Sequence, residues 1–295
     1  MPLAARPAPA RESRPGRRLD RKTMSTLKSR KGRRRAVVLA SSLALGALIA
    51  GFAALMYAAF LRAPENSPAD FLERGRAAGT KQLVVAAGSS STKATLSADW
   101  LASLRNRFGP QGYEFVNAGA NGDTSADLLA RLDSDVIACR PDAIVLLIGG
   151  NDARDQVPPD EFRTNLTAVV DRLRAGTNAR IALLSLPPQG EDLSSAANQA
   201  LASYNDVIKQ VANVRGATYL PLNERFAELL RERSPNTGEF GFGGSLLVAF
   251  ERYALGRTWN EISAGNGLRL LTDHLHLNDD AAAEVTGLVA GWLNA

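Results

Sequence analysis

The sequence predicts an α/β fold, in which a parallel β-sheet carries helices on both faces and one membrane-spanning helix precedes it. Two observations indicate this fold class. From Lys81 to the C-terminus, short apolar segments alternate with longer amphipathic ones, as in consecutive β–α–β units. Upstream, residues 36–61 form an apolar run without a charged side chain. We therefore expect a membrane anchor followed by one folded domain, residues 81–295.

The first 35 residues form a basic tail that we expect to be disordered and cytoplasmic. The tail holds thirteen Lys or Arg residues and only two acids, Glu12 and Asp20. The net charge of the whole chain is +5, so the rest of the chain is net negative. The positive charge therefore gives no indication that the folded part binds nucleic acid. Met24 is an alternative start within the tail.

Residues 36–61 are long enough to cross a bilayer, because a hydrocarbon core ~30 Å thick requires about 20 apolar helical residues. The alternative is a cleaved signal peptide, whose apolar region is typically about 7–15 residues long. The greater length of this run favours an uncleaved anchor. The basic residues before it predict a cytoplasmic N-terminus and an extracytoplasmic domain. Residues 62–80 are polar, contain two prolines and suit a linker.

The folded part contains apolar runs typical of buried strands and periodic segments typical of helices. The predicted strands are residues 83–87, 113–116, 143–148, 181–186 and 217–220. The predicted helices are residues 96–108, 124–136, 159–173, 196–214 and a final one from about 280. Functional sites in such sheets lie at the carboxyl ends of the strands.

Polar, glycine-containing turns follow the first three predicted strands, at residues 88–92, 117–122 and 149–152. A serine in such a turn can point its hydroxyl away from the sheet. Gly119 can offer a backbone N–H and Asn151 a side-chain N–H, and two such donors would stabilise an oxyanion. Each turn also has an ordinary interpretation, because Gly and Asn are common turn residues.

His274 and His276 are the only histidines in the chain. An imidazole is the usual proton acceptor for chemistry near neutral pH. Asp273 precedes His276 by three residues, close enough to orient its ring. In an extended segment both rings would share a side, so spacing alone does not choose between them. A non-catalytic buried turn is the alternative.

Taken in chain order, these residues resemble the blocks of the SGNH hydrolases, also called the GDSL esterase/lipase family. The segment Gly88-Ser89-Ser90-Ser91-Thr92 resembles the family's Gly-Asp-Ser-x-Thr block and places the nucleophile at Ser90. The later blocks are matched by Gly119, Asn151, Asp273 and His276. The resemblance covers roughly residues 82–294. One position departs from it: the family's Asp after the first Gly is Ser89 here.

The resemblance implies a three-layer α/β/α sandwich of flavodoxin-like type, with about five strands and no metal or organic cofactor. It implies a carboxylic ester hydrolase in which His276 is the base, Asp273 orients it, and the oxyanion hole consists of Ser90, Gly119 and Asn151. Substrates would be small-molecule, lipid or glycan esters. The alternative is a catalytically silent, membrane-tethered domain that binds carbohydrate or lipid. The sequence gives no indication of oligomeric state.

Residues 234–270 form an unusually long connection directly before the Asp–His block. Leu246, Leu247, Phe250 and Tyr253 fall at helical spacing. The segment is interpreted either as an extra helix packed on the core or as a pocket wall or lid beside the catalytic histidine. Elsewhere, the single cysteine, Cys139, excludes an internal disulfide and a multi-cysteine zinc site.

Overall fold

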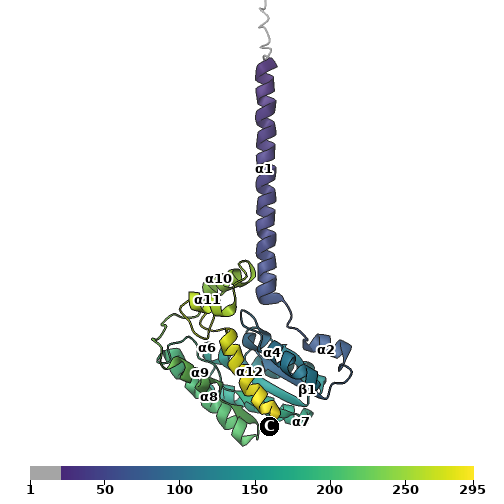
Figure 1. The fold of residues 1–295 in the computed structure, drawn as a ribbon, viewed down its shortest axis with the longest axis vertical. Coiled ribbons are helices and arrows are strands. Elements are labelled where there is room, and N and C mark those ends of the chain that lie inside the picture. Colours follow the sequence, from purple (N-terminus) through teal and green to yellow (C-terminus); the bar gives the residue numbers. More distant parts are fainter. Residues whose placement is uncertain (1–20) are drawn as a thin grey trace, which may run out of the picture. The chain divides into compact units, whose positions relative to one another are not determined.

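The computed structural model describes residues 21–295, with side chains from Arg33 onward. The chain divides into two compact units, Met1–Ala53 and Ala54–Ala295. Helix α1 (Arg21–Met56) begins in the first unit, and a short π-helix, η1 (Tyr57–Leu61), follows it in the second (Figure 1). Arg33–Leu61 is long and apolar enough to cross a membrane. A membrane anchor and an N-terminal signal sequence both have this property.

The prediction of a disordered tail is wrong for residues 21–35, which are helical. Lys, Arg and Met have good helix propensity, and extending an existing helix costs little compared with nucleating a new one. The apolar run downstream therefore suffices as the nucleus. Residues 1–20 of the predicted tail lie outside the described residues.

The second unit is built on a five-stranded sheet in which all neighbouring strands are parallel. The strand order is β2-β1-β3-β4-β5, which is the flavodoxin-like order. The strands are β1 (Gln82–Gly88), β2 (Tyr113–Gly119), β3 (Ala143–Leu147), β4 (Arg180–Leu184) and β5 (Thr218–Leu220). The predicted fold class is confirmed. Gly88 pairs in register with both Gly119 and Leu147, so the first three strands end at the same level.

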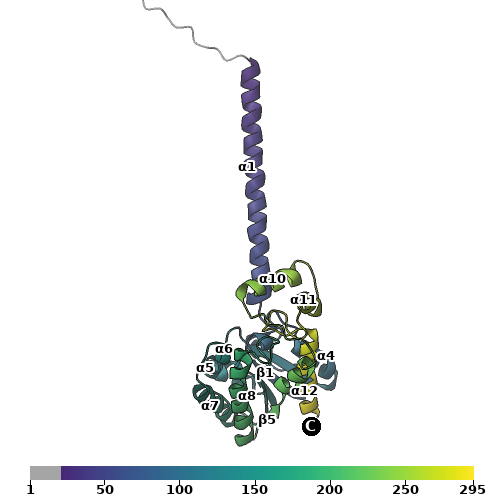
Figure 2. The same cartoon turned by 90° about the vertical axis from the view of Figure 1, so that its left-hand side faces the viewer.

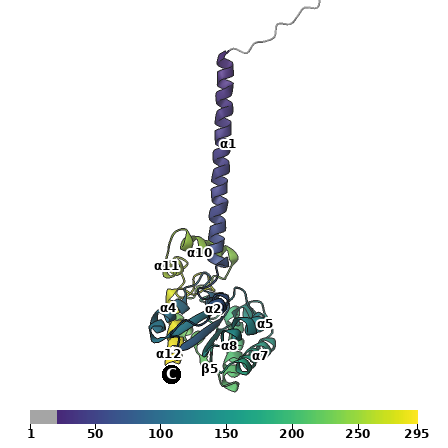
Figure 3. The same ribbon diagram turned by 90° about the vertical axis from the view of Figure 1, so that its right-hand side faces the viewer.

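Helices cover both faces of the sheet, giving three layers (Figures 2 and 3). One layer holds α5 (Ser125–Asp135), α7 (Pro159–Gly176) and α8 (Ala196–Val214); the other holds α4 (Trp100–Phe108), α9 (Leu222–Leu230) and α12 (Asp279–Asn294). The shorter elements are α2 (Pro68–Arg74), α3 (Ser90–Lys93), α6 (Gly150–Arg154), α10 (Phe242–Tyr253), α11 (Trp259–Gly265), η2 (Gly109–Gln111) and η3 (Ile137–Cys139). The apolar face of each long helix packs on the strands and excludes water from the core.

Helix α4 begins at Trp100, later than the predicted start at residue 96. The carboxylate of Asp99 accepts a 2.9 Å hydrogen bond from the Ala102 N–H and caps the helix. Before it, Ala94 and Leu96 have left-handed backbone conformations, with φ of 66° and 49°. The apolar periodicity continues through this turn because Leu96 is buried, which explains the difference.

Residues 62–80 are packed on the domain, whereas the sequence suggested a simple linker. Asn66 covers the open edge of β2: its carbonyl accepts from the Asn117 N–H (3.0 Å), and its side chain donates to the Phe115 carbonyl (2.7 Å). Helix α2 follows with a capping box at Ser67, and its Phe71 is buried. Covering this edge protects it from pairing with another chain. Local composition does not reveal such a long-range contact.

Candidate active site

Ser90 opens the short helix α3 immediately after β1. The turn between them requires glycine at position 88, because a Cβ there would lie 2.3 Å from the Leu147 carbonyl oxygen. Glycine is also required at position 119, at the end of β2, because a Cβ there would lie 2.2 Å from the Lys93 amide nitrogen. Both glycines allow the backbone of α3 to sit directly on the sheet edge. The nucleophile candidate is therefore held by main-chain packing.

Ser90, His276 and Asp273 come together although 186 positions separate Ser90 from His276. The Ser90 Oγ lies 3.1 Å from the His276 Nε2. The His276 Nδ1 lies 3.0 Å and 2.9 Å from the two carboxylate oxygens of Asp273. When Nδ1 carries the proton and donates to Asp273, Nε2 is free to accept the proton of the Ser90 hydroxyl.

The Asp273 carboxylate also organises the loop that carries His276. Its Oδ1 accepts from the backbone N–H groups of Leu275 (3.2 Å) and His276 (2.9 Å). Burial alone would raise the pKa of Asp273, but the His276 charge, these hydrogen bonds and the Ser245 hydroxyl lower it to about 2. The carboxylate therefore stays ionised at neutral pH and can stabilise an imidazolium.

His274 is turned away from the triad. Its φ of 68° is left-handed, so the segment is not extended there and the two imidazoles do not share a side. The ring lies against Gly238, where a Cβ would be 2.5 Å from the imidazole Cε1. Its Nδ1 is buried and has no hydrogen-bond partner within residues 33–295. Backbone geometry thus separates two histidines that sequence spacing could not.

The three oxyanion candidates differ in availability. Ser90 is the first residue of a helix, where an N–H has no intrahelical acceptor. The Asn151 side chain is buried and donates one amide hydrogen to the Asp123 carbonyl (2.8 Å), which leaves its second hydrogen free for another acceptor. The Gly119 N–H instead donates to the Asn117 Oδ1 (2.9 Å). Ser90 and Asn151 line a common pocket of about 30 Å³, and Gly119 is not among its lining residues.

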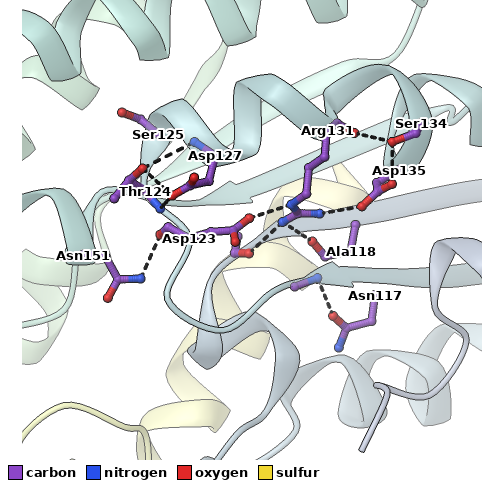
Figure 4. Close-up of polar contacts among 12 residues, drawn as sticks. Asn117, Ala118, Asp123, Thr124, Ser125, Asp127, Arg131, Ser134, Asp135 and Asn151 are labelled. Atoms are coloured by element: carbon purple, nitrogen blue, oxygen red, sulfur yellow. Dashed lines mark hydrogen bonds and ion pairs between the residues drawn. The ribbon is translucent and has the colours of Figure 1, made fainter. Parts of the chain in front are cut away.

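Arg131 ties these turns together, as Figure 4 shows. Its guanidinium donates to the carbonyls of Gly88 (3.2 Å) and Ala118 (2.9 Å) at the ends of β1 and β2. It also forms ion pairs with Asp123 (2.6 Å) and Asp135 (3.1 Å). Because the Asp123 carbonyl holds Asn151, one side chain on α5 connects all three candidate turns. Sequence reasoning missed Arg131, whose only signal is a charge on a helix that packs on the sheet.

Residues 234–270 include α10 and α11, and two side chains of this segment contact Asp273 and His276. Ser245 on α10 is 2% exposed, and its hydroxyl donates to the Asp273 Oδ2 (2.8 Å). The Phe240 ring lies 6.1 Å from the His276 ring in an edge-on arrangement. The segment therefore combines both interpretations: it adds helices to the fold and borders the histidine. Ser245 escaped the sequence analysis, although it directly precedes the predicted apolar stripe from Leu246.

Glu191 is a second residue that sequence reasoning missed. Its buried carboxylate accepts hydrogen bonds from the backbone N–H groups of Arg269, Leu270 and Leu271, at 2.6 to 3.0 Å. These residues lead into the loop that carries Asp273 and His276. A side chain from the loop after β4 thus fixes the start of the segment that carries both residues. Within the described residues, no group of three His, Cys, Asp or Glu side chains could hold a metal ion.

Comparisons with known proteins place the folded domain in a family. The profile of the GDSL-like lipase/acylhydrolase family matches residues 85–283. Esterase TesA of Pseudomonas aeruginosa is 36% identical over 95 residues, which cover 31% of this chain and 47% of that protein. The acetylxylan esterase of Geobacillus stearothermophilus is 28% identical over 134 residues, which cover 42% of this chain and 61% of that protein. The aligned regions thus span about half to three fifths of these curated relatives.

Solved structures extend the likeness of the fold. The acetylxylan esterase Axe2 of Geobacillus stearothermophilus superposes with a TM-score of 0.55 at 20% identity, covering 72% of this chain and 94% of Axe2. LAE5, an alpha/beta hydrolase enzyme from the metagenome of Lake Arreo, Spain, superposes with a TM-score of 0.55 at 20% identity, covering 72% of this chain and 95% of LAE5. At this identity the superpositions establish the fold alone.

Proposed function

Because the chain belongs to the GDSL-like lipase/acylhydrolase family, we propose that it is a carboxylic ester hydrolase and that Ser90, His276 and Asp273 are its catalytic triad. The observation that carries this proposal is the continuous hydrogen-bonded path from the Ser90 hydroxyl through the His276 ring to the Asp273 carboxylate. A catalytically silent binding domain has no need of such a path.

The proposed mechanism has two halves. The Ser90 Oγ attacks the ester carbonyl carbon while the His276 Nε2 takes the hydroxyl proton. The tetrahedral intermediate then collapses, the carbon–oxygen bond to the alcohol breaks, and His276 protonates the leaving alkoxide. In the second half, water attacks the acyl-enzyme, again with His276 as the base, and the acid product leaves. Asp273 remains ionised throughout and stabilises the imidazolium.

The proposed oxyanion hole consists of the Ser90 N–H, the second amide hydrogen of Asn151 and the Gly119 N–H. The first two donors support this assignment because both residues line the pocket beside the nucleophile. The Gly119 donor must be shared with, or released from, the Asn117 side chain that accepts it in this structure. Each correctly placed donor would lower the barrier by about 2.7–4 kcal/mol.

We propose that the enzyme removes short acyl groups, acetyl above all, from the hydroxyls of a glycan. The pocket of about 30 Å³ at Ser90 is small compared with an engineered cavity of about 150 Å³ that binds benzene. A larger groove of about 550 Å³ adjoins it, and the two share Gln189 and Leu275. His274 lines this groove, so its ring can contact the alcohol portion of the substrate. One relative is an acetylxylan esterase, which fits a small acyl pocket beside a larger groove for the alcohol portion.

The test uses full-length protein in a mild neutral detergent and p-nitrophenyl esters of increasing acyl length. We expect kcat/KM to be highest for acetate and to fall with each added pair of carbons. A fluorophosphonate probe should label the wild-type protein and a Ser91→Ala control, but not Ser90→Ala. Preference for long acyl chains would contradict the short-acyl proposal. Absence of both labelling and hydrolysis would favour the silent binding domain.

We further propose that the apolar run is retained as an anchor, with the N-terminus cytoplasmic and the catalytic domain outside. The end of the run supports retention, because Ala59 is buried against the domain. The Phe60 carbonyl also accepts hydrogen bonds from the Asn121 side chain (2.9 Å) and the Lys93 Nζ (3.2 Å). The helix before Met56 still supplies the roughly 20 apolar residues that a bilayer requires. Protease added to spheroplasts should digest the catalytic domain, and protection would overturn the orientation.

A further inference from the structure

A second pocket, of about 510 Å³, lies within the unit Ala54–Ala295, and neither Ser90 nor His276 lines it. Its wall is formed by the end of the apolar run, residues 62–65, the last residue of α3 with the turn before α4, α10 and α11. The residues that matter here are Arg62, Lys93, Arg252, Tyr253 and Trp259. The proposed ester hydrolysis does not use this pocket.

The pocket carries excess positive charge. Arg62, Lys93 and Arg252 have no carboxylate within 4.0 Å among the side chains that the structure describes, from residue 33 to 295. Burial lowers the pKa of Lys93, whose Nζ contacts only a neutral carbonyl, that of Phe60. Lys93 is thus partly desolvated without a counter-charge, and Arg252 is half-buried, an arrangement that an anion would stabilise.

The two carboxylates in the wall do not offset this charge. Glu65 and Asp99 both pair with Arg105, at 3.1 Å and 2.8 Å, and Arg105 is not among the lining residues. Their charge is therefore directed toward Arg105. Arg252 is held in place by stacking over the Trp259 ring, 4.8 Å from its centroid, and by donating to the Arg257 carbonyl (2.9 Å). A guanidinium fixed in this way is well suited to hydrogen-bond a phosphate.

The position of the pocket in the chain indicates where the anion comes from. Arg62 directly follows the apolar segment that ends at Leu61. Trp259 and Tyr253 line the same pocket, and these residue types favour the head-group level of a bilayer. Tyr253 is also close to both arginines, since Arg62 and Arg252 lower the pKa of its hydroxyl against the larger effect of burial. Basic pockets beside membrane spans are one kind of site that binds anionic lipid head groups.

We propose that this pocket binds a phosphate ester through Arg62, Lys93 and Arg252, and that the ester is the head group of an anionic phospholipid. The inference that the ligand carries a phosphate rests on the residues of the pocket alone. The lipid source rests on the membrane anchoring proposed above. Binding here is independent of ester hydrolysis at Ser90.

The experiment titrates full-length protein in a neutral maltoside detergent and follows tryptophan fluorescence, because Trp259 lines the pocket. The ligands are dihexanoyl phosphatidylglycerol, dihexanoyl phosphatidylcholine and glycerol 1-phosphate. The variant Arg62→Gln/Arg252→Gln removes two of the three cations. The control Arg231→Gln/Arg233→Gln removes two exposed arginines that do not line the pocket, so the net charge changes equally.

We expect saturable binding of the phosphatidylglycerol, much weaker binding of the phosphatidylcholine, and at least a tenfold loss of affinity in the pocket variant but not in the control. Hydrolysis of p-nitrophenyl acetate should be equal in all three proteins, which shows that the variants are folded. Equal binding of both lipids, or an unchanged pocket variant, would overturn the proposal. Glycerol 1-phosphate binding as tightly as the lipid would keep the phosphate site and overturn its lipid source. A protein that binds lipid but hydrolyses no ester would contradict only the proposed function.

Discussion

Replacement of Ser245 by Ala tests whether α10 supports catalysis. The Ser245 hydroxyl is one of four donors to the Asp273 carboxylate; the others are the His276 ring and the backbone N–H groups of Leu275 and His276. A buried hydrogen bond to a charged group contributes about 1.5–3 kcal/mol. For a domain of this size, each kcal/mol changes Tm by roughly 2–4 °C, so Ser245→Ala should lower Tm by about 3–12 °C.

The same change should lower kcat on p-nitrophenyl acetate by about tenfold, because an Asp273 with one donor missing holds His276 less firmly. The loss should stay far below that of Ser90→Ala, since three donors remain. Ser245→Thr, which keeps the hydroxyl, should recover most of the activity. The control is Ser263→Ala on α11, which removes a buried hydroxyl that donates to the Leu271 carbonyl (2.7 Å) and does not contact Asp273. That control should lose stability but keep most of its kcat. A Ser245→Ala enzyme with kcat within twofold of wild type would refute the reasoning.

Three further predictions follow from the site and the core. Ser90→Ala and His276→Ala should each lower kcat by several orders of magnitude, and the double variant should be little worse, because triad members act as a unit. His274→Ala should keep most activity on p-nitrophenyl acetate. An inactive His274→Ala and an active His276→Ala would reassign the base. Asn151→Ala should lower kcat by about 10²–10³ with little change in KM, whereas a change confined to KM would assign Asn151 to ground-state binding. Burial raises the pKa of the Cys139 thiol to about 11, so iodoacetamide at pH 8 should modify unfolded protein much faster than native protein, and equal rates would contradict the buried thiol.

The sheet could be predicted from the sequence because its strands are short apolar runs with turn residues at both ends. The turns carrying Ser90, Gly119 and Asn151 were expected at the carboxyl edge because the predicted strands are parallel. In the structure the last residues of β1, β2 and β3 lie in register. The boundaries were less predictable. Leu96 is buried like a helical core residue, but it lies in a left-handed turn that only the Asp99 cap separates from α4.

The supporting side chains could not be predicted, because each acts across a long stretch of chain. Arg131 reaches back 43 positions to the Gly88 carbonyl, and Glu191 reaches forward 78 positions to the Arg269 N–H. Neither contact produces a periodic pattern in the amino-acid sequence. The choice between His274 and His276 likewise depends on one left-handed backbone angle, which the residue types alone do not specify.

With the proposed anchor retained, the hydrogen bonds to the Phe60 carbonyl would limit how far the enzyme can search for substrate. A free, flexible linker of the length of residues 62–80 would let a domain range over roughly 25 Å. Here Lys93, at the end of the four-residue helix that Ser90 begins, is bonded to the last turn of the apolar run. Ser90 lies within one helical turn of Lys93, the residue that makes this contact. An enzyme held in this way would explore its surroundings by lateral diffusion in the membrane plane, and a polymer would have to approach that level to be deacylated.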